Sequence, residues 1–439
     1  MRHPHYLSTV KNTELPSHCI FFDTETKSVQ IEENVEQACL WFGWACYTRR
    51  LTNYVWSEPQ WYRFETEKQF WTWIISKTKS GKKTYIYAHN MSFDFTVVKG
   101  FMSMRRRRWK LIKAIIESPP TALKFSSKGR TLQFVCTLNY FRQSLKELGK
   151  AIGIDKIDMP DADKTPKNWD TYCRRDVEII KDALLFFFKL VKDMDLGPYQ
   201  ITLAAQSFKA YRHRFMTYPI YIDNNEKALQ LSREGYMGGR VECFRLGKIS
   251  EPLYVLDINS QYPYVMRENY MPVKLKGHYK SIKPSDLPKL IDKYCIMAKV
   301  SLTTNIPIFP FRHEDRLVFP VGTFTTTLAT PELLDAIHYN LINNVLEIAI
   351  YEKAIIFKQF IDYFFQKRMA FKVENNEVYS YMFKILMNSL YGKFGQTGLV
   401  FTETELTETD EIKLWIDYDV ETKTIHNMRQ FAGIIQEQS

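Results

Sequence analysis

Acidic side chains follow two strand-like segments in the first half of the chain. Asp23 and Glu25 come at the end of the apolar run in residues 18–25, and because they are two residues apart on an extended chain they face the same side. A second strand-like run, residues 84–88, leads into a segment that contains Asp94. Carboxylates that converge at a strand end offer the oxygen ligands that Mg²⁺ prefers. An Asp-x-Glu pair alone is more often a solvated strand end, so the chemistry depends on further partners.

A long helix predicted over residues 169–195 supplies such partners. Tyr172 and Asp176 are at positions i and i+4, so they lie on one face of this helix. The neighbouring face packs inward through Val177, Ile180 and Leu184. A helix that directs its Tyr and Asp toward the strand-borne acids would complete a site of four carboxylates and two metal ions. Such a site activates water on one ion and stabilises the leaving oxygen with the other.

Another carboxylate stands at a predicted strand end in the second half of the chain. Residues 253–256 form a short apolar run that predicts a buried strand, and Asp257 follows it directly. Pro263 predicts the end of extended pairing or the start of a turn. Just upstream, residues 233–240 form a glycine-rich loop whose backbone can approach a partner closely. The alternative for this loop is a turn that serves only the fold.

Two helices are predicted over residues 357–372 and 377–394, joined by a short turn. In the second helix, Lys384, Asn388 and Tyr391 are at positions i, i+4 and i+7. One face therefore carries a cation, an amide and an aromatic hydroxyl. The alternative is an ordinary amphipathic helix with its polar residues in solvent.

The composition narrows the class of protein. The chain has 439 residues, enough for two or three domains. Its net charge of +11 points to a polyanionic partner, and aromatic residues at 15% suit single-stranded nucleic acid, where bases stack. The seven cysteines include no Cys-x-x-Cys pair, which argues against a disulfide framework and structural zinc. No signal peptide is visible, and the longest apolar run, residues 183–188, is too short to span a bilayer, so we expect neither secretion nor membrane insertion.

The acidic segments of the first half resemble the three motifs of the proofreading 3′–5′ exonucleases of the DEDD group. The matching residues are Asp23-x-Glu25, Asn90-x-x-Phe93-Asp94 and Tyr172-x-x-x-Asp176. The resemblance implies that the four acidic residues bind Mg²⁺, with Mn²⁺ as an alternative, and that Tyr172 orients the attacking water. It also implies that Asn90 and Phe93 hold the single-stranded 3′ end of DNA.

Three shorter segments of the first half are also candidates for contact with DNA. Thr137-Leu138 resembles the short element that binds the frayed strand in the protein-primed subgroup of family B DNA polymerases. Lys156 lies where that subgroup keeps a catalytic lysine near the scissile phosphate, although a solvated loop lysine is an equal alternative. Residues 105–108 are four successive arginines, which favours an auxiliary contact with phosphates over a solvated face only slightly.

Residues 257–263 resemble the first polymerase motif of family B DNA polymerases, with Gln261 in place of the usual leucine. The resemblance implies that Asp257 binds two Mg²⁺ ions. It also implies that the backbone at Ile258 holds the triphosphate of the incoming dNTP and that Tyr262 packs beneath its sugar.

The predicted helix over residues 377–394 resembles the second polymerase motif. The matching residues are Lys384-x-x-x-Asn388-Ser389-x-Tyr391-Gly392. The resemblance implies that Lys384 contacts the triphosphate, that Tyr391 lines the pocket of the nascent base pair and that Asn388, Ser389 and Gly392 lie toward the DNA.

Two further matches concern nucleotide and DNA binding. Lys372 is placed like a second lysine that binds the triphosphate, with an exposed lysine of the fingers as the alternative. Tyr236-x-Gly238-Gly239 resembles the loop that joins the exonuclease and polymerase modules and holds the primer or template.

The resemblance predicts an α/β fold in which an RNase H-like exonuclease domain, a mixed sheet with helices, precedes an incomplete α+β palm and helical fingers. The expected parts are the exonuclease over 1–195, a palm part with the first motif over 196–270, an insertion similar to the region that contacts the priming protein over 271–350, the fingers over 351–396, and the start of a second insertion or palm over 397–439.

A third polymerase motif, Tyr-x-Asp-Thr-Asp, is not found, and Asp417-Tyr418-Asp419 matches it poorly. We therefore expect the N-terminal part of a protein-primed family B DNA polymerase of a virus or mobile element, without the third motif and thumb. The alternatives are a standalone Mg²⁺-dependent 3′–5′ exonuclease and a non-catalytic DNA-binding subunit of a split polymerase. Expected partners are primer-template and single-stranded DNA, dNTP, a terminal priming protein and a completing C-terminal polypeptide, at a cytoplasmic, organellar or viral replication site.

Overall fold

A computed structural model describes residues 3–32, 35–52, 55–117, 119–161, 166–313, 316–396, 401–407, 411–419, 422 and 424–438. The chain divides into two compact units. The first unit combines residues 1–9 with 215–363, and the second combines residues 10–214 with 364–439. Each unit is described by itself.

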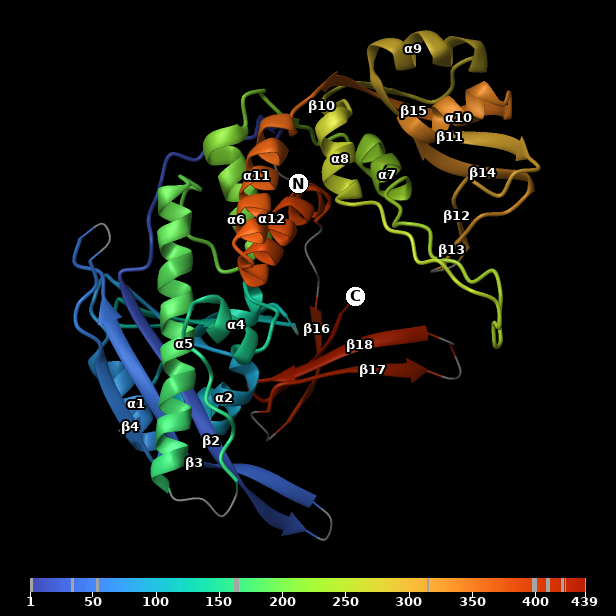
Figure 1. Ribbon diagram of the computed structural model, residues 1–439. Helices are drawn as coiled ribbons and strands as arrows, with labels where there is room; N and C mark the ends of the chain where they lie inside the picture. Colours follow the sequence, from blue (N-terminus) through green and yellow to red (C-terminus); the bar gives the residue numbers. More distant parts are fainter. Residues whose placement is uncertain are drawn as a thin grey trace. The chain divides into compact units, whose positions relative to one another are not determined.

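The second unit contains a mixed sheet of seven strands in the order β4-β3-β2-β5-β8-β7-β6 (Figure 1). The strands are β2 (His18–Glu32), β3 (Val35–Arg49), β4 (Gln60–Phe64), β5 (Lys83–Ala88), β6 (Lys110–Ile116), β7 (Thr121–Ser127) and β8 (Arg130–Cys136). The central strands β2, β5 and β8 pair in parallel, and the other pairings are antiparallel. The expected mixed sheet of the first half is thereby confirmed.

Helices cover both faces of this sheet because successive side chains of β2 alternate between them. Ile20 and Phe22 face a buried core that includes Phe70 and Trp71 of α1 (Glu67–Ser76) and residues of α2 (Met91–Val97) and α3 (Gly100–Arg106). Phe21 faces the other side, where it stacks on Tyr87. The 28-residue helix α5 (Pro166–Asp193) packs there against β2, β3 and β5. Asp23 and Glu25 share the parity of Phe21 and so point toward α5.

The remaining helices of this unit are α4 (Leu145–Ala151), α6 (Leu203–Ala210) and α12 (Glu377–Gly395), with the 3₁₀ turn η1 (Thr137–Asn139). The predicted pair of helices is confirmed, as α11 (Lys358–Val373) is followed by α12. Within the second unit, Phe371 of α11 stacks on Phe383 of α12 at 5.5 Å between ring centroids. The side chain of Asn376 caps α12 by accepting a hydrogen bond from the backbone of Tyr379.

A small antiparallel sheet near the C-terminus belongs to the same unit. Its strands lie in the order β16-β19-β18-β17, with bounds β16 (Phe401–Leu406), β17 (Lys413–Asp419), β18 (Thr424–Phe431) and β19 (Ile434–Gln438) (Figure 1). Phe431 packs into the core beneath the large sheet, where its ring lies 6.0 Å from that of Phe101. The side chain of Arg105 donates a hydrogen bond to the carbonyl of Ala432. At least one residue of the arginine run therefore has a structural contact within the protein.

The first unit is built on an antiparallel sheet in the order β10-β15-β11-β14. Its elements are β1 (His5–Tyr6), β9 (Tyr221–Ile222), α7 (Glu226–Glu234), α8 (Gln261–Glu268), β10 (Met271–Tyr279), η3 (Pro284–Asp286), α9 (Leu287–Lys293), β11 (Cys295–Thr304), β12 (Phe311–His313), β13 (Arg316–Val318), β14 (Gly322–Ala329), α10 (Thr330–His338) and β15 (Ile342–Ala354). A buried cluster lies between this sheet and the helices α9 and α10. The helix α7 packs on β11 and β15, where Leu231 is buried.

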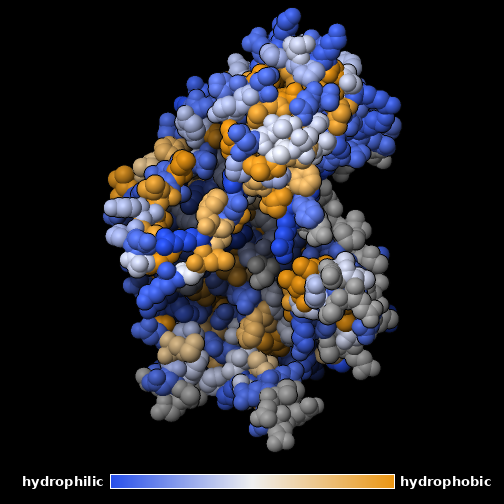
Figure 2. Space-filling model, turned by 90° about the vertical axis from the view of Figure 1, so that its right-hand side faces the viewer, coloured by the Kyte–Doolittle hydropathy of each residue, from blue (hydrophilic) through white to orange (hydrophobic). Residues whose placement is uncertain are grey.

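The strand predicted at residues 253–256 is wrong. Residues 237–259 contain no helix or strand, and no described strand pairs with residues 253–256. Tyr254, Val255 and Leu256 are 88%, 96% and 90% exposed. A β-branched, apolar run favours a strand only where a neighbouring strand supplies backbone hydrogen bonds. Figure 2 shows that hydrophobic side chains also lie open elsewhere on one face of the molecule, between hydrophilic ones.

Candidate active site

The long strand β2 and the helix α5 bring two carboxylates and a thiol together. Potential ligand atoms of Asp23, Glu25 and Cys173 lie within 4.8 Å of one another. Cys173 is fully buried, and its sulfur lies 3.6 Å from the carbonyl oxygen and 3.7 Å from a carboxylate oxygen of Asp23. Phe21 pairs with Tyr87 near the end of β5, so Asp23 stands just past the point where that parallel neighbour stops.

The third acidic residue comes from α2, which follows β5 after a tight turn. Asn90 makes this turn with a left-handed backbone (φ 69°), a conformation that asparagine tolerates better than most residues. The carboxylate of Asp94 accepts hydrogen bonds from the backbone N–H of Thr24 at 3.1 Å and from its hydroxyl at 2.7 Å. Asp94 is only 2% exposed. It is thereby held against β2 between the positions of Asp23 and Glu25.

The helix α5 supplies the fourth acid. Asp176 is 4% exposed, and its Oδ2 is paired with the ammonium group of Lys156. Its Oδ1 is buried and has no hydrogen-bond partner among the described residues. Lys156 also lies over the ring of Tyr172, with Nζ 4.2 Å from the ring centroid. The structure therefore brings Tyr172 and Lys156 to the carboxylates, and the side chain of Lys156 is largely buried rather than solvated.

Electrostatics in this cluster favour an additional cation. Burial raises the pKa of Asp23 well above its usual value, and the charges of Asp94, Asp176 and Glu25 raise it further. Burial and the charge of Asp176 raise the pKa of Glu25 to about 7. Lys156 opposes both shifts but is a single cation among four acids. Buried carboxylates are stable as ions only when they are paired or coordinate a metal, so these residues fit a divalent cation.

In metal-free protein, the raised pKa of Glu25 should make stability fall as the pH rises. The folded state retains a proton up to a pH of about 7 that the unfolded chain releases near its ordinary pKa. The free energy of unfolding should therefore decrease between these two pH values, by roughly 3 kcal/mol. Urea unfolding with a chelator at several pH values checks this, with Glu25→Gln expected to show a shallower decrease.

The comparison with Glu25→Gln is needed because His89 changes the free energy of unfolding with pH in the opposite direction. Burial lowers the pKa of His89 to about 4, so its contribution to stability is lost as the pH falls below the ordinary histidine value. Equal slopes for the wild type and Glu25→Gln would contradict the account of Glu25.

The residues predicted to hold single-stranded DNA fall into two groups. Asn90 and Phe93 are exposed beside Asp94, and Phe93 is 43% exposed. Thr137 is fully buried, and its hydroxyl is hydrogen-bonded to Nδ1 of His89 at 2.8 Å. Leu138 is partly buried against the core under the sheet. Asn90 and Phe93 are therefore accessible to a ligand, whereas Thr137 can act in this structure only by positioning its neighbours.

In the first unit, the two polymerase-like segments lie next to each other. A side chain on Gly239 would meet the hydroxyl of Tyr262 at 3.4 Å. Gly238 faces open space, and Tyr236 is 49% exposed. Tyr262 lies in the first turn of α8 and is 48% exposed. Asp257 and Ile258 are also exposed, the latter at 66%.

In the second unit, α12 carries the residues of the second polymerase-like motif. Lys384 and Tyr391 are exposed, and Ser389 and Gly392 are partly exposed. Oδ1 of Asn388 is buried without a hydrogen-bond partner in the described part of the chain. Of the three residues predicted along one face of this helix, Lys384 and Tyr391 are therefore accessible, whereas the amide of Asn388 is turned partly inward. Lys372 is exposed at the C-terminal end of α11.

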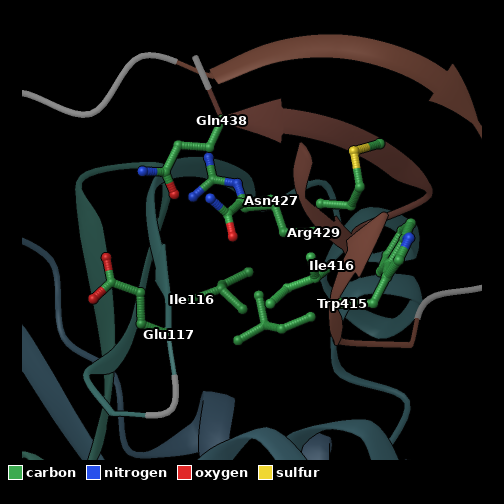
Figure 3. Close-up of a pocket in the computed structure, with 9 residues that line it drawn as sticks. Ile116, Glu117, Trp415, Ile416, Asn427, Arg429 and Gln438 are labelled. Carbon is green, nitrogen blue, oxygen red and sulfur yellow. The ribbon is translucent and has the colours of Figure 1, made fainter. Parts of the chain in front are cut away.

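A hollow of about 280 Å³ separates β6 from the C-terminal sheet (Figure 3). Ile116 and Glu117 line one side, and Trp415, Ile416 and Arg429 line the other. Asp417 and Asp419 lie on the same strand β17, which pairs antiparallel with β18. None of the four clustered acids lines this hollow.

Sequence reasoning missed Cys173, Thr24 and His89. One available signal was that Cys173 and Asp176 are three residues apart on a helix and so share a face. The contribution of Thr24, a backbone N–H and a hydroxyl directed at Asp94, requires the turn after β5 to be known.

Comparison with known proteins places the chain in a family. Residues 155–435 match the model of the family described as DNA polymerase type B, organellar and viral. The chain belongs to this family. The match includes α5 and both segments that resemble polymerase motifs, so the resemblance inferred from the sequence is confirmed.

Relatives include polymerases of fungi and a phage. A probable DNA polymerase of Ascobolus immersus is 26% identical over 273 residues, which are 59% of this chain and 22% of that protein. The DNA-directed DNA polymerase of Enterobacteria phage PRD1 is 23% identical over 382 residues, 84% of this chain and 60% of that protein. The chain thus spans about a fifth to three fifths of the length of these type B relatives.

Among solved structures, Phi29 DNA polymerase in a ternary complex with primer-template DNA and incoming nucleotide substrates is similar, with a TM-score of 0.68. The alignment covers 97% of this chain and 73% of that chain at 15% identity. The chain therefore has the Phi29 polymerase fold, and the predicted fold class is confirmed. Among the described residues, no helix is both long and apolar enough to cross a membrane.

Proposed function

We propose that this type B polymerase chain shortens DNA from its 3′ end in a reaction that depends on divalent metal. One observation carries the proposal: Asp23, Glu25, Asp94 and Asp176 converge from β2, α2 and α5 and are short of positive charge. Residues so distant in sequence, with pKa values raised by burial and mutual repulsion, are typical of a functional site. Mg²⁺, or Mn²⁺, is the cofactor that oxygen ligands of this kind would hold.

The side chains around the carboxylates suit hydrolysis of a phosphodiester. Divalent metal supplies activation of water and stabilisation of the leaving oxygen. Tyr172 would orient the attacking water through its hydroxyl, and Lys156 would offer positive charge to the scissile phosphate. Asn90 and Phe93 are exposed beside Asp94, where an amide and an aromatic ring could hold an unpaired terminal nucleotide.

The test is direct. Single-stranded DNA labelled at its 5′ end should give a ladder of progressively shorter labelled products with Mg²⁺ and remain intact with a chelator. Release of the label as a short product in the first time points would indicate cutting from the other end, and an unchanged substrate would exclude the proposed trimming.

Lys156 should stabilise the metal-free protein through Asp176. Lys156→Ala leaves Asp176 buried without its partner, and we expect a loss of about 3 kcal/mol with a chelator present. Mg²⁺ should restore more stability to this variant than to the wild type. Thermal unfolding with and without Mg²⁺ measures both effects.

Lys181→Ala is the matched control, since Lys181 pairs with Asp182 on the same helix and Asp182 is 31% exposed. Equal losses of stability in the two variants would show that Lys156 has no special relation to the carboxylate cluster.

We further propose that the chain takes part in protein-primed DNA synthesis. Asp257 and Tyr262, with the backbone at Ile258, would bind metal and dNTP, while Lys372, Lys384 and Tyr391 would contact the nucleotide. The glycine-rich loop and the residues Asn388, Ser389 and Gly392 would lie toward the primer-template. The family membership and the bound substrates named for the Phi29 complex support this assignment.

The exposure of residues 253–258 favours a completing polypeptide. Leu253, Tyr254, Val255, Leu256 and Ile258 present an apolar, strand-forming sequence to solvent, and unpaired edges of this type bind added strands. A polypeptide that supplies such strands would bury the run and could bring a second carboxylate near Asp257. The region over 271–350 would contact the priming protein.

A standalone exonuclease is the second candidate. The two proposed metal sites differ in a way that favours it. Asp94 and Asp176 of the exonuclease-like cluster are buried and held in place, whereas Asp257 of the polymerase-like segment is exposed and lies in a segment without regular structure. Primer extension by this chain, alone and together with a candidate completing polypeptide, separates the two candidates.

A further inference from the structure

Cys173 places a sulfur donor in a site otherwise made of oxygen ligands. Its sulfur and the carboxylate oxygens of Asp23 and Glu25 lie within 4.8 Å of one another. The thiol is fully buried against β2, and none of the described cysteines is in a disulfide. A thiol directed at two carboxylates is a donor set that a hard cation such as Mg²⁺ does not need.

We propose that Asp23, Glu25 and Cys173 bind thiophilic divalent cations, Cd²⁺ or Zn²⁺, and that these ions inhibit trimming by competing with Mg²⁺. This inference rests on the proposed metal-dependent function of the same site. Thiolate and carboxylate ligands together suit Zn²⁺ and its softer congener. As the sulfur–metal bond forms, the thiol proton is released to the buffer.

A second observation points to a cation here independently of the cysteine. Oδ1 of Asp176 is buried without a hydrogen-bond partner in the part of the chain that the structure describes. The ammonium group of Lys156 pairs with the other oxygen of this carboxylate, Oδ2, and so does not satisfy Oδ1.

The geometry needs only a small adjustment. Zinc–ligand bonds of about 2.0 to 2.3 Å place neighbouring ligand atoms of a tetrahedral site roughly 3.5 Å apart. The sulfur of Cys173 is already 3.7 Å from a carboxylate oxygen of Asp23. Closing the remaining separation, at most 4.8 Å, requires a movement of about 1 Å that rotation of the Glu25 side chain can supply. Such a metal ion would need a fourth ligand, and water or substrate could provide it.

Cd²⁺ is the probe because a cadmium–thiolate bond has a charge-transfer absorption in the ultraviolet. Titration of the full chain with Cd²⁺ should produce this band, and Cys173→Ser should remove it. Cys46→Ser is the matched control, as Cys46 is also fully buried in the same unit and is not part of the cluster. A band of equal size in Cys173→Ser and the wild type would overturn the proposal.

Two further readouts keep the proposal testable. Glu25→Gln retains the thiol and should raise the Cd²⁺ concentration for half-maximal absorption at least about tenfold, and an unchanged titration of this variant would contradict the proposed ligand set. In DNA trimming, Cys173→Ser should raise the Cd²⁺ concentration that halves the Mg²⁺-supported rate by a similar factor, whereas equal inhibition would contradict competition at this site. A wild type that shows the band but never trims DNA would refute the proposed function and leave the metal site standing.

Discussion

Asp23→Ala is expected to slow the shortening of single-stranded DNA about 10³-fold at saturating Mg²⁺. Burial and the charges of three neighbouring acids raise the pKa of Asp23 well above its usual value. Removing it takes away a ligand from a metal whose contribution to the transition state is several kcal/mol, and each 1.36 kcal/mol is a factor of ten in rate. The measurement is the initial rate of ladder formation from 5′-labelled DNA in excess enzyme.

The control for this prediction is Asp182→Ala. Asp182 lies on the same helix as Asp176 but is paired with Lys181 and is partly exposed. Its removal should change the trimming rate less than about threefold, because Asp182 is not one of the four clustered acids. Trimming by Asp23→Ala within a few-fold of the wild-type rate would remove Asp23 from the mechanism.

Asp257→Ala is expected to reduce primer extension about 10³-fold while trimming is unchanged. Asp257 would hold the metal ions of nucleotide transfer. Its loss should therefore remove about as much stabilisation of the transition state as the loss of Asp23 does in the proposed exonuclease site. The assay extends a labelled primer with dNTP, using the chain alone and together with a candidate completing polypeptide. Trimming of single-stranded DNA by the same preparation reports whether the second unit is intact.

Asp286→Ala provides the matched substitution in the first unit, since Asp286 is an exposed acid that makes no side-chain capping bond to α9. It should extend primers at the wild-type rate. Full extension activity in Asp257→Ala would show that this residue is no metal ligand, and loss of trimming in that variant would show that the two activities are not separate.

Much of the carboxylate cluster could be predicted because the spacing of its residues along the sequence matches the strand and the helix that carry them. Asp23 and Glu25 follow the apolar run as predicted, but they lie within β2, which continues to Glu32, so the predicted strand end is wrong. Tyr172 and Asp176 are spaced for one helix face, as predicted. The turn at Asn90, where residues 84–88 end, delivers Asp94 to the same place. Periodicity also predicted the two helices on either side of Asn375 and Asn376.

The features that the sequence did not predict depend on contacts between segments far apart in the chain, which residue spacing does not reveal. Residues 253–256 have strand-forming side chains, but a strand requires a neighbour, and none of the described strands pairs with them. The contact of Cys173 with Asp23 depends on how α5 crosses β2. Thr137 was expected to contact DNA, but its hydroxyl is bonded to His89 inside the protein. The roles proposed for individual residues in DNA and nucleotide binding remain predictions.

The most direct test of the central claim is the binding of Mn²⁺ followed by electron paramagnetic resonance, which reports the free ion. The wild type should bind Mn²⁺ more tightly, and at more sites, than a variant that carries both Asp23→Ala and Asp176→Ala, with Asp182→Ala indistinguishable from the wild type. Identical binding curves for the wild type and the double variant would contradict the claim that these buried carboxylates gather metal ions.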